Sequence, residues 1–170
     1  MTKVSTRLNR LSESATLAMA RMSRELKMQG HDVIALSLGE PDFDTPDFVK
    51  EAAKKAVDNN FSHYTPVPGL AELREAIAEK LKRDNGLEYT PEQIVASTGA
   101  KQSIANVCMS LLNPGDEVLL PAPYWVSYFE IIKLAEGTPV EISSSIETDF
   151  KVSPEQLEAA ITPNTKLLLF

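Results

Sequence analysis

The chain has 170 residues, of which 43% are hydrophobic and 24% are charged, a composition typical of an ordinary globular domain with its own core. Its formal net charge of -7 argues against nucleic acid or an anionic membrane as a partner, because such partners need a concentrated basic surface. No stretch approaches the roughly 20 apolar residues that span a bilayer, and the start lacks a secretory signal, so we expect a cytoplasmic protein.

Cysteine and histidine are too rare to build a disulfide framework or a metal cluster. Cys108 is the only cysteine, and His31 and His63 lie far apart in the sequence, so we expect no metal site. Cys108 lies in an apolar helical run at 104–112, which favours a buried structural thiol over a nucleophile.

The start of the chain predicts one helix and one strand. Residues 14–29 place apolar side chains among good helix formers and end at Gly30, which predicts an amphipathic helix. The apolar run VIALSL at 33–38 then predicts a short buried strand.

Two further helices follow, separated by loops that are rich in proline. Pro46 fits the first position of a helix that reaches about residue 59, with Asp44 or Thr45 as its cap. Residues 70–85 have the apolar spacing of an amphipathic helix, and Gly86 closes it as a C-terminal cap.

From residue 86 onward, predicted strands and helices alternate. The expected strands are 94–97, 117–120, 139–142 and 167–170, and the expected helices are 100–112, 124–136 and 154–161. This alternation predicts an α/β fold with right-handed crossovers and a mainly parallel sheet flanked by helices. The apolar run at 166–170 has no turn or cap after it, so we expect the chain to be truncated inside a central strand.

The turn at 97–102 (STGAKQ) is the first candidate binding site. A predicted strand passes through Gly99 directly into a helix, which points backbone N–H groups and the positive end of the helix dipole at one place and suits a phosphate. The same sequence is also consistent with an ordinary turn that binds no ligand, in which Gly99 only allows the chain to bend. Lys101 opposes the helix dipole, which favours a nearby anion, although a solvated lysine also fits there.

Three other residues emerge just past predicted strands or in loops. Trp125 follows the strand at 117–120, where it could stack on a planar ring or simply cover the sheet. Gly39 would let the backbone approach a small ligand, and a plain proline-rich loop is the alternative. Tyr64 could donate a hydrogen bond to a phosphate or pack against its own loop.

In this order and spacing, the motifs resemble class I aminotransferases with the type I pyridoxal-phosphate fold. The motifs that carry the resemblance are SAT (14–16), GEPDFDTP (39–46), Tyr64, PGLAELR (68–74), GAKQ (99–102), NPGD (113–116) and PYWVSY (123–128). They cover essentially the whole chain. GAKQ and PYWVSY are particularly similar to the bacterial aspartate aminotransferase branch.

The resemblance implies pyridoxal 5'-phosphate as the cofactor. The backbone amides of Gly99, Ala100 and Lys101 would hold its phosphate, and Trp125 would stack on its pyridine ring. Tyr64 would reach the phosphate of the neighbouring subunit's cofactor, which implies a homodimer.

The resemblance also implies how an amino acid and a 2-oxo acid would be bound. Gly39 would bind the substrate α-carboxylate through its amide, beside Trp125, and Thr16 and Lys101 would recognise the side-chain carboxylate of a dicarboxylic substrate. Some members also accept prephenate and carry a basic residue near the position of Ser12. The serine here departs from that pattern.

No catalytic residue is expected within the chain, because in this family the Schiff-base lysine lies beyond residue 170. We therefore expect these 170 residues alone not to transaminate. Residues 1–45 would form an N-terminal arm and a segment of the small domain, and residues 46–170 the first part of the large cofactor-binding domain.

The resemblance leaves three functions open for the full-length protein. The leading one is amino transfer from L-aspartate to 2-oxoglutarate, giving oxaloacetate and L-glutamate. An alternative enzyme of the same fold would act on aromatic or neutral amino acids, or would be a C–S lyase. A third alternative is a non-catalytic binding or dimerisation fragment.

Overall fold

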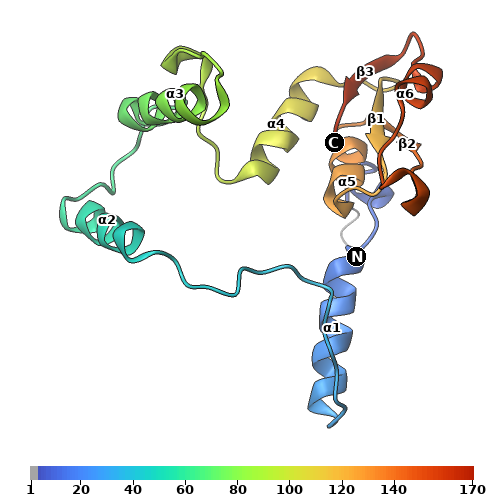
Figure 1. The fold of residues 1–170 in the computed structure, drawn as a ribbon, viewed down its shortest axis with the longest axis horizontal. Helices are drawn as coiled ribbons and strands as arrows, with labels where there is room; N and C mark the ends of the chain where they lie inside the picture. The colour runs from blue at the N-terminus through green and yellow to red at the C-terminus, as the bar shows by residue number, and fades with distance from the viewer. Residues whose placement is uncertain (1–3) are drawn as a thin grey trace. The chain divides into compact units, whose positions relative to one another are not determined.

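The computed structural model describes residues 4–170, which form helices and a small sheet (Figure 1). The helices are α1 (Ala15–Met28), α2 (Asp47–Asp58), α3 (Ala71–Asn85), α4 (Ala100–Leu111), α5 (Val126–Leu134) and α6 (Pro154–Ala160). The strands are β1 (Glu117–Pro121), β2 (Thr138–Ile142) and β3 (Thr165–Leu168). The chain divides into two compact units, of which one is Glu40–Ala100 and the other comprises the residues up to Gly39 together with Lys101–Phe170.

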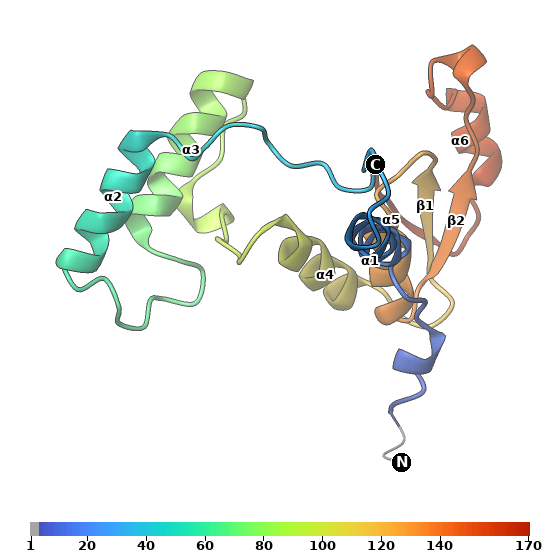
Figure 2. The same ribbon diagram turned by 90° about the horizontal axis from the view of Figure 1, so that it is seen from below.

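The sheet lies in the unit that contains Lys101–Phe170, and both of its strand pairings are parallel. This agrees with the mainly parallel sheet that the sequence predicts. Its strand order is β2-β1-β3, with Val118 of β1 opposite Pro139 of β2 on one side and Leu167 of β3 on the other. Figures 1 and 2 both show β1 and β2 side by side, with α5 next to them. The α/β alternation in the second half of the chain is therefore confirmed.

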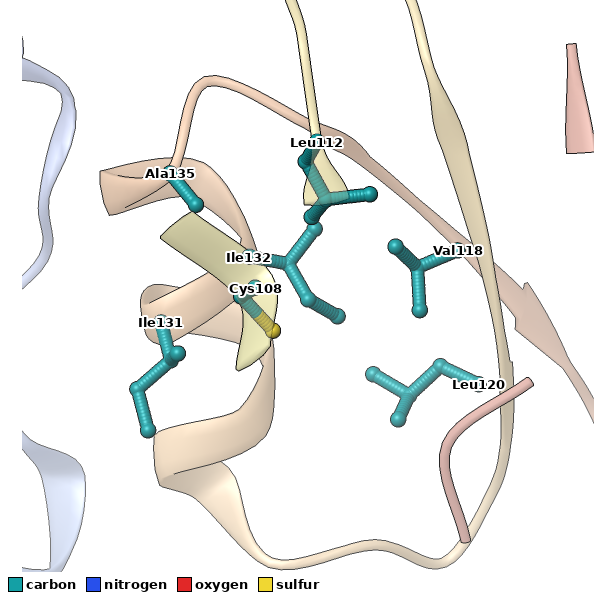
Figure 3. Close-up of a cluster of buried hydrophobic side chains, with 7 residues drawn as sticks. All are labelled: Cys108, Leu112, Val118, Leu120, Ile131, Ile132 and Ala135. Carbon is teal, nitrogen blue, oxygen red and sulfur yellow. The ribbon is translucent and has the colours of Figure 1, made fainter. Parts of the chain in front are cut away.

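The core of this unit lies between β1 and two helices. Val118 and Leu120 are two residues apart on β1, so both side chains point to the same face of the sheet. Figure 3 shows them directed toward side chains from α4 and α5. The seven residues of this cluster are Cys108, Leu112, Val118, Leu120, Ile131, Ile132 and Ala135. Leu119 is also buried, so β1 is covered on both faces, as central parallel strands are.

Cys108 is the buried free thiol that the sequence predicts. Only 2% of the residue is exposed, and it packs within the cluster of Figure 3. Burial raises the pKa of the Cys108 thiol, which disfavours the thiolate that a nucleophile would need.

Most helix ends are where local sequence signals put them. The Ser14 side chain accepts a hydrogen bond from the Leu17 N–H and caps α1, and Gly86 ends α3 in the left-handed conformation. The predicted cap of α2 is wrong. The helix begins at Asp47 after Pro46, whose extended backbone (ψ 143°) keeps it outside the helix, and no side chain caps it. Asp47 instead places a negative charge in the first turn, where the helix dipole favours it.

Two predicted strands are absent from the described residues. The run at 33–38 forms no strand, and its Ile34 and Leu36 are 85% and 91% exposed. Residues 94–97 also form no strand, although the backbone at Ile94 is extended. An apolar run becomes a strand only when a neighbouring strand accepts and donates its backbone hydrogen bonds. No segment between residues 4 and 170 forms such a ladder with either run.

Within the unit Glu40–Ala100, a close approach between two loops depends on Gly69. The Ala96 N–H donates to the Pro68 carbonyl at 2.9 Å, and a Cβ built on Gly69 would lie 2.8 Å from the Ala96 Cβ. Gly69 also has φ +99°, a conformation that side chains other than glycine rarely adopt.

We expect Gly69→Ala to lower the free energy of unfolding by about 2–4 kcal/mol, because it adds a steric clash to backbone strain. Gly86→Ala is the matched control, since Gly86 has φ +66° but open space around it. It should cost only about 1 kcal/mol. Urea unfolding measures both, and equal losses would show that the contact with Ala96 contributes nothing.

None of the helices described between residues 4 and 170 is long and apolar enough to cross a membrane.

Candidate functional site

The turn before α4 has the backbone geometry that an anion site needs. Gly99 has φ +83°, its N–H donates to the Ser97 carbonyl at 2.8 Å, and a Cβ built there would meet nothing within 4 Å. The first N–H groups of a helix have no acceptor inside the helix, and those of α4 begin with Ala100 and Lys101. Together with the helix dipole, they favour a negatively charged group such as a phosphate at this end of α4.

Lys101 and Trp125, which are 24 positions apart in the sequence, lie against each other. The Lys101 Nζ is 4.7 Å from the centroid of the Trp125 ring, within the range of a cation–π contact. Trp125 is the residue before α5 and follows the carboxyl end of β1. Its ring forms a T-shaped pair with that of Tyr128, with the ring centroids 5.5 Å apart. Trp125 is 44% exposed, so it does not serve as a core residue covering the sheet in this chain. Indole surface is therefore available to a flat ligand beside a cation.

Hydrogen bonds to the end of β2 fix the loop that presents Trp125. The Ala122 N–H donates to the Ile142 carbonyl at 2.9 Å, and the Ser144 hydroxyl donates to the Ala122 carbonyl. The Tyr124 hydroxyl donates to the Glu141 carboxylate at 2.6 Å. The loop that carries Trp125 is therefore held by β2 and by the residue Ser144 beyond its end.

Burial, together with the hydrogen bond to Glu141 and its charge, raises the pKa of Tyr124 to about 12. Because the folded-state pKa lies above the ordinary value of about 10, the neutral phenol contributes stability that is complete below pH 10. This contribution is lost as the pH rises through about 12.

We expect a tyrosinate titration at 295 nm, taken as the difference between wild type and Tyr124→Phe, to show one phenol with a midpoint near 12. The same difference taken between Glu141→Gln and Glu141→Gln/Tyr124→Phe should give a midpoint nearer the ordinary value, because the carboxylate is gone. A midpoint near 10 in the wild-type difference would contradict the hydrogen bond between Tyr124 and Glu141.

A cavity of about 400 Å³ lies beside Lys101. It is bounded on one side by the segment that leads into α1 and on the other by α5 and the loop before it. The lining residues are Leu11, Ser12, Glu13, Ser14, Ala15, Lys101, Tyr124, Val126, Ser127, Phe129, Glu130, Ile131 and Leu134. The lining is largely apolar. Among the described residues that line it, Lys101 is the one cation, and Glu13 and Glu130 are the carboxylates. Lys101 could bind the negative group of a small molecule in this cavity.

The remaining predicted site residues are placed as follows. Thr16 is half-buried in the first turn of α1, directly after the cavity residue Ala15, but it does not itself line the cavity. Gly39 is exposed, and a Cβ built on it would meet nothing within 4 Å, so no described segment packs against it. Tyr64 belongs to the unit Glu40–Ala100 and is fully exposed. Of the predicted residues, the structure thus brings Lys101 and Trp125 into direct contact.

Sequence analysis missed three acidic residues at the site. Glu141 accepts a hydrogen bond from Tyr124, and Glu13 and Glu130 line the cavity. The only local signal for Glu130 is its helical spacing of three from Lys133, which is typical of any exposed ion pair. Among residues 4–170, no group of three or more histidine, cysteine or acidic residues could hold a metal ion.

Comparison with known proteins gives the same family for the whole length of the chain. Residues 31–170 match the model of aminotransferase class I and II. The chain is 54% identical, over all 170 residues, to an aspartate/prephenate aminotransferase of Cereibacter sphaeroides, and 47% identical over 169 residues to a probable aspartate/prephenate aminotransferase of Thermus aquaticus. It spans 42% and 44% of the length of these two relatives.

Solved structures agree with the sequence relatives. An aspartate aminotransferase of Thermus thermophilus with maleate matches 99% of this chain with a TM-score of 0.93 and 46% identity, and the match covers 44% of that protein. The aspartate aminotransferase of Rhizobium meliloti matches 99% of this chain with a TM-score of 0.95 and 42% identity, over 42% of its own length. Both have the type I fold of pyridoxal-phosphate enzymes. The chain therefore belongs to the class I and II aminotransferase family.

Proposed function

We propose that the full-length protein transfers the amino group of L-aspartate to 2-oxoglutarate with pyridoxal 5'-phosphate as its cofactor. The observation that carries this proposal is the placement of Lys101, which lies in the first turn of α4 after the glycine turn, with its Nζ 4.7 Å from the centroid of the Trp125 ring. A cation between an anion-binding helix end and an exposed indole suits a phosphorylated ring together with an acidic substrate.

The chain offers suitable groups for holding the cofactor. We propose that the amides of Gly99, Ala100 and Lys101 bind its phosphate and that the Trp125 indole stacks on its ring. For this, the Gly99 N–H would exchange its present acceptor, the Ser97 carbonyl, for a phosphate oxygen. When bound, pyridoxal phosphate supplies an electron sink for negative charge that develops at the substrate α-carbon. The anchored loop at 121–125 keeps the indole in place and helps to exclude water from one side of the ring.

We propose that three residues bind the two carboxylates of the substrate. The Lys101 ammonium and the Thr16 hydroxyl would bind the side-chain carboxylate, because a charged hydrogen bond distinguishes an acidic side chain from a neutral one. The Gly39 N–H would bind the α-carboxylate beside Trp125. The relatives' names include aspartate, and the Thermus thermophilus structure was solved with maleate, a four-carbon dicarboxylate. Both support an acidic substrate.

We further propose that the enzyme is a homodimer in which Tyr64 of one subunit reaches the cofactor phosphate held by the other. The full exposure of Tyr64 leaves its hydroxyl available for such a contact. In the full-length protein, residues 1–45 would form the arm and a small-domain segment, and residues 46–170 would begin the large domain.

The substrate class is tested by the ratio of kcat/KM for L-aspartate to that for L-phenylalanine, measured with 2-oxoglutarate and the full-length protein. We expect L-aspartate to be preferred by at least about tenfold, the discrimination that one charged hydrogen bond supplies. A preference for L-phenylalanine would favour the aromatic alternative. Retained cofactor without any turnover would favour the non-catalytic binding role.

Prephenate is a second candidate substrate, because the names of the two sequence relatives include it. Ser12 on the cavity wall does not supply the basic side chain expected for it. With L-aspartate as donor, we expect prephenate to be used less efficiently than 2-oxoglutarate. Prephenate turnover at a similar rate would show that Ser12 does not limit it.

A further inference from the structure

The carboxylate of Glu130 joins α5 to the segment that leads into α1. The Ser12 N–H donates to the Glu130 Oε2 at 3.0 Å, across 118 positions of sequence. On the other side, the Lys133 Nζ lies 3.3 Å from both carboxylate oxygens. The Glu130 and Lys133 side chains are only 27% and 23% exposed, so this arrangement is more shielded from water than an ordinary surface ion pair.

The segment that Glu130 holds has no secondary structure to fix it. Residues 11–14 lie between a single 3-10 turn (Leu8–Arg10) and the start of α1, and they form one wall of the cavity. Glu130 lines the opposite wall, on α5. The hydrogen bond between Ser12 and Glu130 therefore sets the distance between the two walls of the cavity beside Lys101.

Lys133 makes an acidic residue tolerable in this place. A lone carboxylate on the wall would repel an acidic ligand, because like charges a few ångströms apart repel each other strongly where water is scarce. Lys133 neutralises the Glu130 carboxylate and lies over the Phe129 ring, with its Nζ 5.3 Å from the ring centroid. Glu130 can thus act through its hydrogen bond without adding negative charge to the cavity.

We propose that Glu130 is a positioning residue for the amino-acid substrate. It holds residues 11–14 against α5 and thereby sets the width of the cavity next to Lys101 and the placement of Thr16 in the first turn of α1. Glu130 does not touch the substrate. This inference rests on the proposed aminotransferase function.

The alternative is that the hydrogen bond between Ser12 and Glu130 only stabilises the fold. The chain contains a matched example, since Arg10 precedes the same segment and its Nη1 lies 4.0 Å from the Glu136 carboxylate. Glu136 follows α5 and does not line the cavity. Glu136→Gln is therefore a control that removes an acid near the same segment without changing the cavity wall.

In the full-length enzyme, we expect Glu130→Ala to raise the KM for L-aspartate by about tenfold while kcat changes by less than about threefold, because binding is loosened more than the reacting groups are displaced. Glu130→Gln keeps an oxygen that accepts from the Ser12 N–H and should restore most of the KM. Glu136→Gln should leave both constants unchanged. A Glu130→Ala enzyme with a wild-type KM, or an equal rise in KM in Glu136→Gln, would overturn the proposal.

Hydrogen–deuterium exchange provides a readout that does not need turnover. The Ser12 amide should exchange faster in Glu130→Ala than in the wild type, and at the wild-type rate in Glu136→Gln. If the wild type does not use L-aspartate, the proposed function is wrong. Exchange of the Ser12 amide still tests whether Glu130 holds the segment, because it does not depend on turnover. Unchanged exchange of the Ser12 amide in Glu130→Ala would show that Glu130 does not hold the segment.

Discussion

Replacing Lys101 with alanine is expected to lower kcat/KM for L-aspartate by about 10- to 100-fold in the full-length protein, because a hydrogen bond to a charged group contributes about 1.5–3 kcal/mol. The effect on L-phenylalanine should be less than about threefold, since that side chain has no carboxylate to lose a partner. The backbone amide of Lys101 remains in the variant, so cofactor affinity should fall little. Steady-state kinetics with both amino acids measures the difference.

Lys151→Ala is the control for the loss of a lysine as such. Lys151 is exposed, its Nζ lies 2.6 Å from the Asp149 carboxylate, and it does not line the cavity. Its replacement should leave both substrates unaffected. Equal losses for L-aspartate and L-phenylalanine in Lys101→Ala would contradict a role in recognising the side-chain carboxylate, and would point to the cofactor instead.

Replacing Ile132 with alanine is expected to lower the free energy of unfolding by about 2–5 kcal/mol, the usual cost of emptying a buried aliphatic site. Ile132 is fully buried in the cluster of Figure 3, between α4 and β1. The Ile132 side chain is tightly packed against Gly137, because a Cβ built on Gly137 would lie only 3.2 Å from the Ile132 Cγ2. Urea unfolding measures the loss.

Ile161→Ala is the matched control, because Ile161 is 58% exposed. It should change the free energy of unfolding by less than about 0.5 kcal/mol. The helix α5 carries both Ile132 and Glu130, and Trp125 is the residue before its start. A loss in Ile132→Ala no larger than in Ile161→Ala would mean that this cluster does not hold α5 in place.

The elements that the sequence predicts well are those with local signals. Helix α1 is defined by Ser14 at its start, and helix α3 ends at Gly86, where the positive φ suits glycine. The parallel strands β1 and β2 match the predicted runs 117–120 and 139–142 to within a residue. Such signals act over a few residues, so they can be read without knowing the fold.

The errors fall where a structure depends on distant partners. The runs 33–38 and 94–97 have the composition of strands, but no ladder forms with them in the described part of the chain. The strand β3 begins at Thr165, two residues before the predicted start, because it pairs beside Glu117 of β1. Composition indicates that a segment can be a strand, whereas pairing decides whether it is one.

The candidate site shows the same division. The glycine turn at Gly99 and the indole of Trp125 could be identified as candidates from their motifs, and their roles stay predictions. The contact between Lys101 and Trp125 could not be deduced from spacing alone. The bond between Ser12 and Glu130 joins residues 118 positions apart, and no local pattern predicts it.

The central claim is tested most directly by transamination of the full-length protein after its cofactor has been removed. Oxaloacetate is measured as L-aspartate and 2-oxoglutarate react, with and without added pyridoxal 5'-phosphate. The account predicts that oxaloacetate forms only when the cofactor is restored, and that Trp125→Ala needs more cofactor for half of the full rate. Formation without the cofactor, or no formation with it, would contradict the account.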